Sequence, residues 1–133
     1  MTRKLIFLFL IAMMMLTACD KSVAPRGNPQ AWIDDPLDGM SLPLQPYLIT
    51  LHGSDPLGIS LMEVTINGAV LATITNPDPA QLLVHLTQQW EPAAPGRYVI
   101  RARAQDISGA WSAEDLVTVV VEDISTPTPI ITV

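Results

Sequence analysis

The residue with the most reactive side chain is Cys19, the only cysteine in the chain. One thiol cannot form a disulfide within the chain, and zinc sites usually combine several cysteine or histidine ligands. Cys19 follows an apolar run from Leu5 to Leu16 that contains no charged residue. Two interpretations fit this position: an incidental cysteine at the end of an export signal, or a cysteine that is itself modified.

The residues before Cys19 have the organisation of an export signal. Arg3 and Lys4 give a positive start, and the twelve apolar residues that follow are fewer than the roughly 20 that cross a bilayer as a helix. The sequence "LTAC", residues 16–19, resembles the bacterial lipobox. The resemblance implies cleavage before Cys19, a diacylglycerol on its sulfur, and a lipoprotein anchored on the extracytoplasmic face of a bacterial cell membrane.

The net charge of the mature chain limits the classes of partner that it is expected to bind. Removal of residues 1–18 takes away Arg3 and Lys4, which leaves five of the seven basic residues against 13 acidic ones, a formal charge of −8. A chain this acidic is poorly suited to the phosphate backbone of a nucleic acid. We therefore expect the membrane, through Cys19, and an envelope protein as partners, and no nucleic acid.

The histidines are the next residues that could do chemistry. The stretch "HGSD", residues 52–55, holds the residue types of a hydrolase triad, but triads are assembled from separated segments of a chain. We expect an outward His52 followed by a turn, and an outward His85 on another strand. The sequence therefore predicts no catalytic residue, no metal site and no cofactor.

Calcium is an alternative for the aspartates, because hard cations take oxygen ligands. Five aspartates fall at the ends of expected strands: Asp34, Asp35, Asp38, Asp55 and Asp106. The chain has no Asp-x-Asp-x-Asp-Gly loop, and aspartate is common in turns because its side chain bonds to nearby backbone. Turn formation is the favoured interpretation.

The elements that would position these residues show the two-residue period of strands. Seven strands are expected, at residues 31–34, 47–53, 59–66, 69–74, 81–90, 97–106 and 114–122. Asn67-Gly68 between two of them is a strong hairpin signal, because both residues tolerate positive φ. The pattern predicts an all-β fold, a seven-stranded antiparallel sandwich over residues 31–124, with a tether at 19–30 and a Pro/Thr-rich tail at 125–133.

A family resemblance covers this whole predicted domain. The residues that carry it are Trp90, Pro92, Gly96, Tyr98, Ala104, Asp106 and Gly109. They resemble the bacterial immunoglobulin-like and fibronectin-type-III-like modules of cell-surface proteins, although the intersheet cysteine pair of antibody domains is missing. The resemblance implies a tyrosine corner, in which the Tyr98 hydroxyl bonds to backbone near Pro95.

One face of the predicted sandwich is a candidate docking surface. In a sandwich of this type the third, sixth and seventh strands share a sheet, and their outward residues are Leu61, Glu63, Thr65, Val99, Arg101, Arg103, Leu116, Thr118 and Glu122. This set is either a solvated sheet with Arg–Glu pairs or a surface that binds another protein. Trp111 is either a platform for sugars or a partner, or a cover on the end of the core, and Trp32 and Trp90 are assigned to the core.

These observations predict a lipid-anchored, non-catalytic lipoprotein whose immunoglobulin-like domain is a binding or spacer module at the cell surface. Two alternatives stay open. One is an accessory domain split from a larger surface enzyme or adhesin. The other is a carbohydrate-binding module, which would need several exposed aromatic residues.

Overall fold

The structure is a computed structural model that describes residues 27–124, and it contains eight β-strands within them. The predicted signal peptide, Cys19, most of the predicted tether and the Pro/Thr-rich tail lie outside the described residues. Within the described residues there is no helix of the length and apolarity that crossing a membrane requires.

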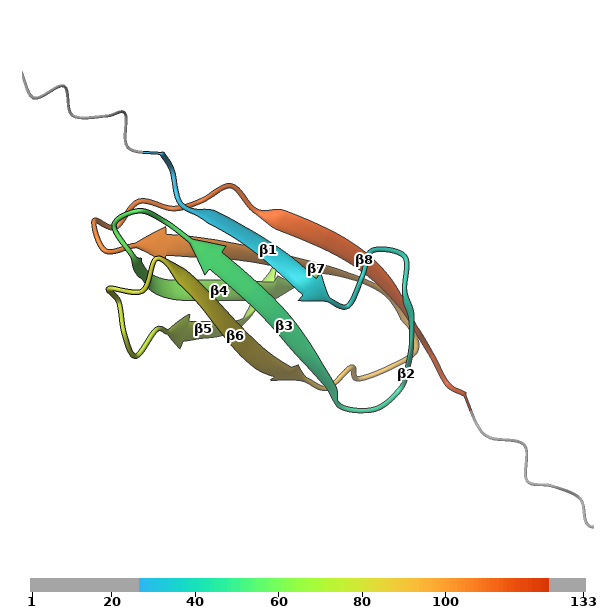
Figure 1. Ribbon diagram of the computed structural model, residues 1–133. Coiled ribbons are helices and arrows are strands. Elements are labelled where there is room, and N and C mark those ends of the chain that lie inside the picture. The colour runs from blue at the N-terminus through green and yellow to red at the C-terminus, as the bar shows by residue number, and fades with distance from the viewer. Residues whose placement is uncertain (1–26, 125–133) are drawn as a thin grey trace, which may run out of the picture.

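The eight strands form two sheets that face each other (Figure 1). The three-stranded sheet has the order β1 (Gln30–Asp35), β3 (Tyr47–Ser54) and β6 (Leu83–Trp90). The five-stranded sheet has the order β2 (Ser41–Pro43), β8 (Asp115–Glu122), β7 (Gly96–Asp106), β4 (Ile59–Ile66) and β5 (Ala69–Thr75). The first and the last described segments leave this sandwich at opposite ends (Figure 1).

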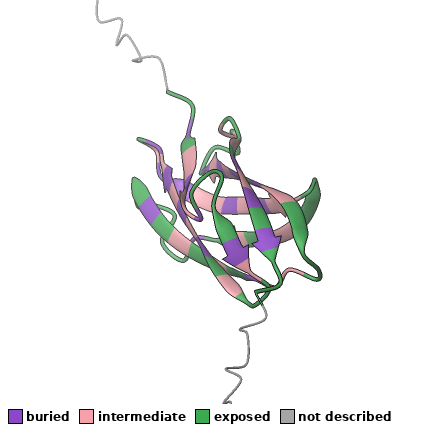
Figure 2. Cartoon of the chain, turned by 90° about the vertical axis from the view of Figure 1, so that its right-hand side faces the viewer, coloured by how far each residue is buried: buried purple, intermediate pink, exposed green. Residues whose placement is uncertain are grey.

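The core lies between the sheets because apolar residues alternate with polar ones along the strands. Ile49 and Leu51 of β3 meet Val64 of β4 and Ile100 of β7, and all four are fully buried. Figure 2 shows the same alternation as buried bands that interrupt half-buried and exposed residues along each strand. The predicted inner faces of these strands are confirmed.

Gly53 lets the two sheets approach each other closely. Its missing side chain would point inward, where a Cβ would lie 3.1 Å from Met62 Sδ and 3.3 Å from the Cβ of Ala104. The thioether of Met62 occupies this space instead, which keeps the core dense.

The predicted hairpin at Asn67-Gly68 is confirmed. The two residues have φ values of 49° and 84°, as a tight turn between right-twisted antiparallel strands requires. The amide oxygen of Asn67 also accepts a hydrogen bond from the Val99 backbone N–H at 2.8 Å. This bond ties the β4–β5 turn to the neighbouring strand β7.

The predicted strand count of seven was wrong, because β2 gives no periodic signal in sequence. It has only three residues and ends on a proline, which suits an edge strand. It pairs in parallel with β8, so the sandwich is not wholly antiparallel. The all-β, two-sheet architecture is confirmed.

Candidate functional site

The outer face of the three-stranded sheet carries a row of aromatic rings. Trp32, His52 and His85 are direct cross-strand neighbours on β1, β3 and β6. The Trp32 and His52 rings are stacked, with centroids 5.5 Å apart and planes 13° apart, and the His52 and His85 centroids are 4.6 Å apart. Both histidines face outward, as predicted.

The prediction that Trp32 belongs to the core was wrong, whereas the same prediction for Trp90 is confirmed. Ala31 and Ile33 take the inward positions of β1 and pack on the core, so alternation turns Trp32 outward. Trp32 is half-buried there by its contact with His52.

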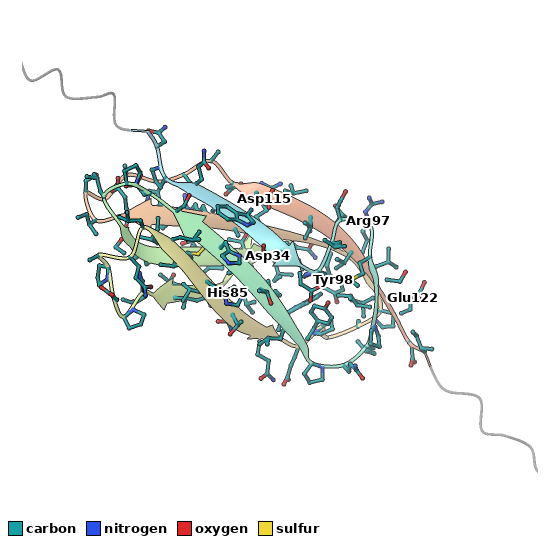
Figure 3. The ribbon with its side chains drawn as sticks, in the orientation of Figure 1. Asp34, His85, Arg97, Tyr98, Asp115 and Glu122 are labelled. Carbon is teal, nitrogen blue, oxygen red and sulfur yellow. The ribbon has the colours of Figure 1, made fainter. Side chains whose placement is uncertain are left out.

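A carboxylate joins this row at an irregularity of the sheet. The pairing of β1 with β3 shifts between Ile33 and Asp35, so Asp34 is the extra residue of a β-bulge. Bulges re-aim side chains. Here the Asp34 carboxylate meets Nδ1 of His52 in a short polar contact, and Figure 3 shows Asp34 and His85 on the same sheet.

The donor atoms of Asp34, His52 and His85 all lie within 4.8 Å of one another. The two histidines look isolated in the sequence because 32 residues lie between them along the chain. Both histidines have outward parity in the sequence, and the structure adds that their strands, β3 and β6, pair in one sheet. Outward parity is the part of the signal that the sequence carries, and the register that brings the two rings together is given only by the structure.

On the other outer face, Arg103 is held by two partners. Its guanidinium Nη2 lies 2.7 Å from Glu63 Oε1, and its Nε donates to the same oxygen at 2.9 Å. Its carbon Cζ lies 4.1 Å from the centre of the Trp111 ring, a cation–π contact. The Trp111 ring is half-buried beside β7, with the Arg103 guanidinium over it.

The rest of the predicted docking face is more open. The strands β4, β7 and β8 share one sheet, as predicted. Arg101 pairs with Glu114 at 3.2 Å and lies opposite Leu116, whose side chain is 45% exposed. Leu61 and Val99 are half-buried on the same face. Within this face, the structure brings apolar and charged residues side by side as the sequence indicated.

No three of the five aspartates considered for calcium bring their carboxylates together within the described residues. Within residues 27–124, the one group of three or more side chains that brings metal-ligating atoms together is Asp34, His52 and His85. Asp38 accepts from the Thr118 N–H at 2.8 Å, and Asp35 accepts from the Tyr47 hydroxyl at 2.6 Å. Burial, together with this contact to Asp35, raises the pKa of Tyr47 to about 12.

Asp55 and Asp106 are buried turn residues. Asp55 accepts from the Leu57 N–H at 2.7 Å, which closes the turn after "HGSD", and His52 faces away from it on the outer side of β3. Asp106 accepts from the Ser108 hydroxyl at 2.7 Å and from the Ala110 N–H at 2.9 Å. The Ser108 hydroxyl bond is the main cause that lowers the pKa of Asp106, against the opposing effect of burial.

The tyrosine corner implied by the resemblance is present. The Tyr98 hydroxyl donates to the Ala94 carbonyl at 2.7 Å, one residue from the expected Pro95. The Tyr98 ring packs edge-on against Trp90 with centroids 5.0 Å apart. This corner fixes the loop that leads into β7.

No protein-family model matches the chain, and no curated protein matches it. Several solved structures are similar in fold, and three of them show the range. The fibronectin(III)-like modules of Clostridium thermocellum CbhA share 20% identity with a TM-score of 0.55, over 71% of this chain and 98% of that one.

The CARDB domain of the PF1109 protein from Pyrococcus furiosus, solved in complex with di-metal ions, shares 17% identity with a TM-score of 0.55. That match covers 74% of this chain and 90% of the other. The PKD domain of an M14-like peptidase from a Thermoplasmatales archaeon shares 20% identity with a TM-score of 0.50, over 75% and 98%. At this identity the similarity shows the fold alone, and residues 27–124 form an immunoglobulin-like β-sandwich.

Proposed function

We propose that this chain is a lipid-anchored lipoprotein on the extracytoplasmic face of a bacterial membrane, and that its domain is a non-catalytic binding or spacer module. The lipobox-like residues 16–19 and the short apolar run before them support the anchor. Each methylene of an acyl chain that enters the bilayer contributes about 0.8 kcal/mol, so two or more chains on Cys19 anchor the protein stably.

The observation that carries the spacer role is the placement of the chain ends. The described chain enters the sandwich at one end and leaves it at the other, so segments attached before and after it are held apart by the length of the domain (Figure 1). The similar solved domains include modules named as parts of larger proteins, such as the PKD domain of a peptidase. That similarity supports a modular role.

The observation that supports a binding role is the outer face of β4, β7 and β8. Leu116 is 45% exposed, and Arg101 of β7 lies directly opposite it. Val120 is 38% exposed, and Arg97 of β7 lies directly opposite it. Apolar side chains bordered by charge are typical of surfaces that bind other proteins. The partner that fits this face is an envelope protein with an acidic rim.

The alternative of an accessory domain cut from a larger surface enzyme or adhesin has a direct test. Sequencing the DNA downstream of the Val133 codon would reveal an in-frame continuation under this alternative. A stop codon with no related reading frame after it would count against it.

The anchor is tested at its single attachment atom. In a bacterial host grown with labelled palmitate, the full chain should carry the label and fractionate with membranes. Cys19→Ser should lose the label and keep an uncleaved leader, while Ser41→Cys in the Cys19→Ser background restores a thiol away from the lipobox and should stay unlabelled. An unlabelled wild-type protein would contradict the anchor.

The docking face is tested with a photo-crosslinking amino acid placed at Leu116, in the living cell. Leu48, on the outer face of the three-stranded sheet, is the matched control because it is also an exposed strand leucine, at 54%. A binding module should give a discrete crosslinked band from position 116 and not from 48, and Arg101→Glu should weaken that band. No band at either position would leave the spacer role and remove the docking face.

A further inference from the structure

We propose that Asp34, His52 and His85 form a binding site for one divalent transition-metal ion of the zinc and copper class. The site lies on the outer face of the three-stranded sheet, away from the face proposed for protein docking. It differs from the sequence-based expectation that the chain binds no metal. It is independent of the lipid anchor, because it rests on described residues alone.

The sheet itself brings the two imidazoles together. His52 and His85 are directly opposite each other in the β3–β6 register, so their side chains leave the sheet at neighbouring points on one face. Their ring centroids are 4.6 Å apart. Two adjacent strands are a rigid support for a pair of ligands.

The third donor comes from the bulge in β1. The Asp34 carboxylate already contacts Nδ1 of His52, which shows that it reaches the imidazole pair. Donor atoms bound to one zinc ion at about 2.1 Å lie about 3.4 Å apart, and here all three donors lie within 4.8 Å. Rotation of the exposed His85 ring supplies the remaining movement, which is at most about 1.4 Å.

Trp32 positions the central ligand. Its indole stacks nearly parallel to the His52 imidazole, which restrains the rotation of that ring without donating an atom to the site. His52 is thus held on one side by Trp32 and contacted by Asp34 and His85. His85 is exposed, and it leaves the site open to solvent.

The donor set selects the kind of metal. Imidazole nitrogen suits zinc, copper and nickel, whereas calcium and magnesium prefer oxygen ligands alone. Three protein ligands leave at least one coordination position for water or for a group from a partner. We therefore expect binding of Zn²⁺ and Cu²⁺ and no saturable binding of Mg²⁺ or Ca²⁺ at this face.

The test is calorimetric titration of ZnCl₂ into the full chain, purified in detergent without a polyhistidine tag. The expected result is saturable binding of one ion per chain. His85→Ala should weaken binding by at least about tenfold, the scale on which even supporting residues of metal sites act. Thr87→Ala is the matched control, because Thr87 is also exposed on β6 and faces the same side.

A second readout distinguishes this site from metal bound elsewhere. Zinc is diamagnetic, so the ring ¹⁵N signals of the two histidines report directly which nitrogen binds it. Both rings should shift together in the wild-type chain, and the His52 signal of the His85→Ala variant should not shift at the same zinc concentration. Equal affinity of the His85→Ala and Thr87→Ala variants, or no saturable binding by the wild type, would overturn the proposal. Since His85 is exposed, a thermal melt matching the wild type is expected for His85→Ala.

Discussion

The two outer faces of this sandwich use their polar residues in opposite ways. On the five-stranded sheet, Arg103 already has Glu63 and the Trp111 ring as partners, and Arg101 has Glu114. On the three-stranded sheet, the His85 ring makes no hydrogen bond within residues 27–124, although two other donor side chains lie beside it. The arginines of the five-stranded sheet thus have partners within the domain. The three-stranded sheet instead presents the neighbouring donor atoms of Asp34, His52 and His85 on its outer face.

The difference between the two faces shows which polar groups stabilise the sheet and which are available to bind a ligand. A guanidinium that is paired with a carboxylate and an indole holds strands together, and its groups are not free for a partner. The docking proposed for the five-stranded sheet would therefore depend on its exposed apolar residues and on the weaker Arg101 pair, whereas the histidine row has atoms available for a ligand. Substitutions at matched positions test this contrast.

The largest effect is expected at Asp106, where the turn after β7 is fixed. Asp106→Ala removes the acceptor of the Ser108 hydroxyl and of the Ala110 N–H, and it should lower the free energy of unfolding by about 2–3 kcal/mol. Asp34→Ala, on the ligand face, should cost about 1 kcal/mol or less, because its pair with His52 is partly exposed. Urea denaturation measures both. Equal losses would show that the partly exposed Asp34 pair stabilises the fold as much as the buried turn at Asp106 does.

The Asp106 effect should also depend on pH. The folded-state pKa of Asp106 is below its value in the unfolded chain, about 3.9, so its stabilisation is present above that pH. It is lost as the pH falls through the folded-state pKa. The difference in stability between the wild type and Asp106→Ala should therefore narrow in acid, and a constant difference from pH 7 to pH 2 would contradict this assignment.

The next largest effect is expected at Arg103. Arg103→Ala removes a two-nitrogen contact to Glu63 and the cation–π contact to Trp111, and it should cost about 1–2 kcal/mol. Arg101→Ala is the control on the same strand and face; it removes one exposed pair and should cost about 0.5 kcal/mol or less. Thermal melts of both variants give the comparison. Similar melting temperatures would show that the Arg103 contacts do not stabilise the sheet.

A smaller effect than that of Arg103→Ala is expected on the inner side of β7, at Tyr98. Tyr98 points inward, and Tyr98→Phe keeps its contact with Trp90 but removes the hydrogen bond to Ala94. The expected cost is about 1 kcal/mol, typical of one lost hydrogen bond. A melting temperature equal to that of the wild type would show that this corner does not contribute to stability.

Much of the fold was predictable because alternation reports which face of a strand is buried. It placed Ile100 and Val119 inward and Arg101 and Arg103 outward, and the Asn67-Gly68 turn followed from the conformational freedom of its residues. Strand β2 was not predictable in this way. Three residues that pair in parallel with a strand far along the chain leave no local pattern.

The histidine site was missed because a local pattern gives parity but not register. His52 and His85 meet only if β3 and β6 pair without a slip of one residue, and the hairpin of β4 and β5 intervenes in sequence. The position of Asp34 depends further on a bulge that no residue type announces. Trp32 was assigned to the core by its position in the first strand, although the parity of Ala31 and Ile33 argued for the outer face.

The parallel pairing of β2 with β8 gives the domain a mechanical property. The chain enters and leaves at opposite ends, so tension applied through its two ends pulls these parallel strands in opposite directions along their length. Backbone bonds that cross between the two segments, such as Gly39 N–H to the Thr118 carbonyl and Val120 N–H to the Met40 carbonyl, are then loaded in shear. Bonds loaded in shear resist together, whereas bonds at an unzipping end fail one at a time. We therefore expect the hydrogen bonds between β2 and β8 to be the part of the domain that resists unfolding under force.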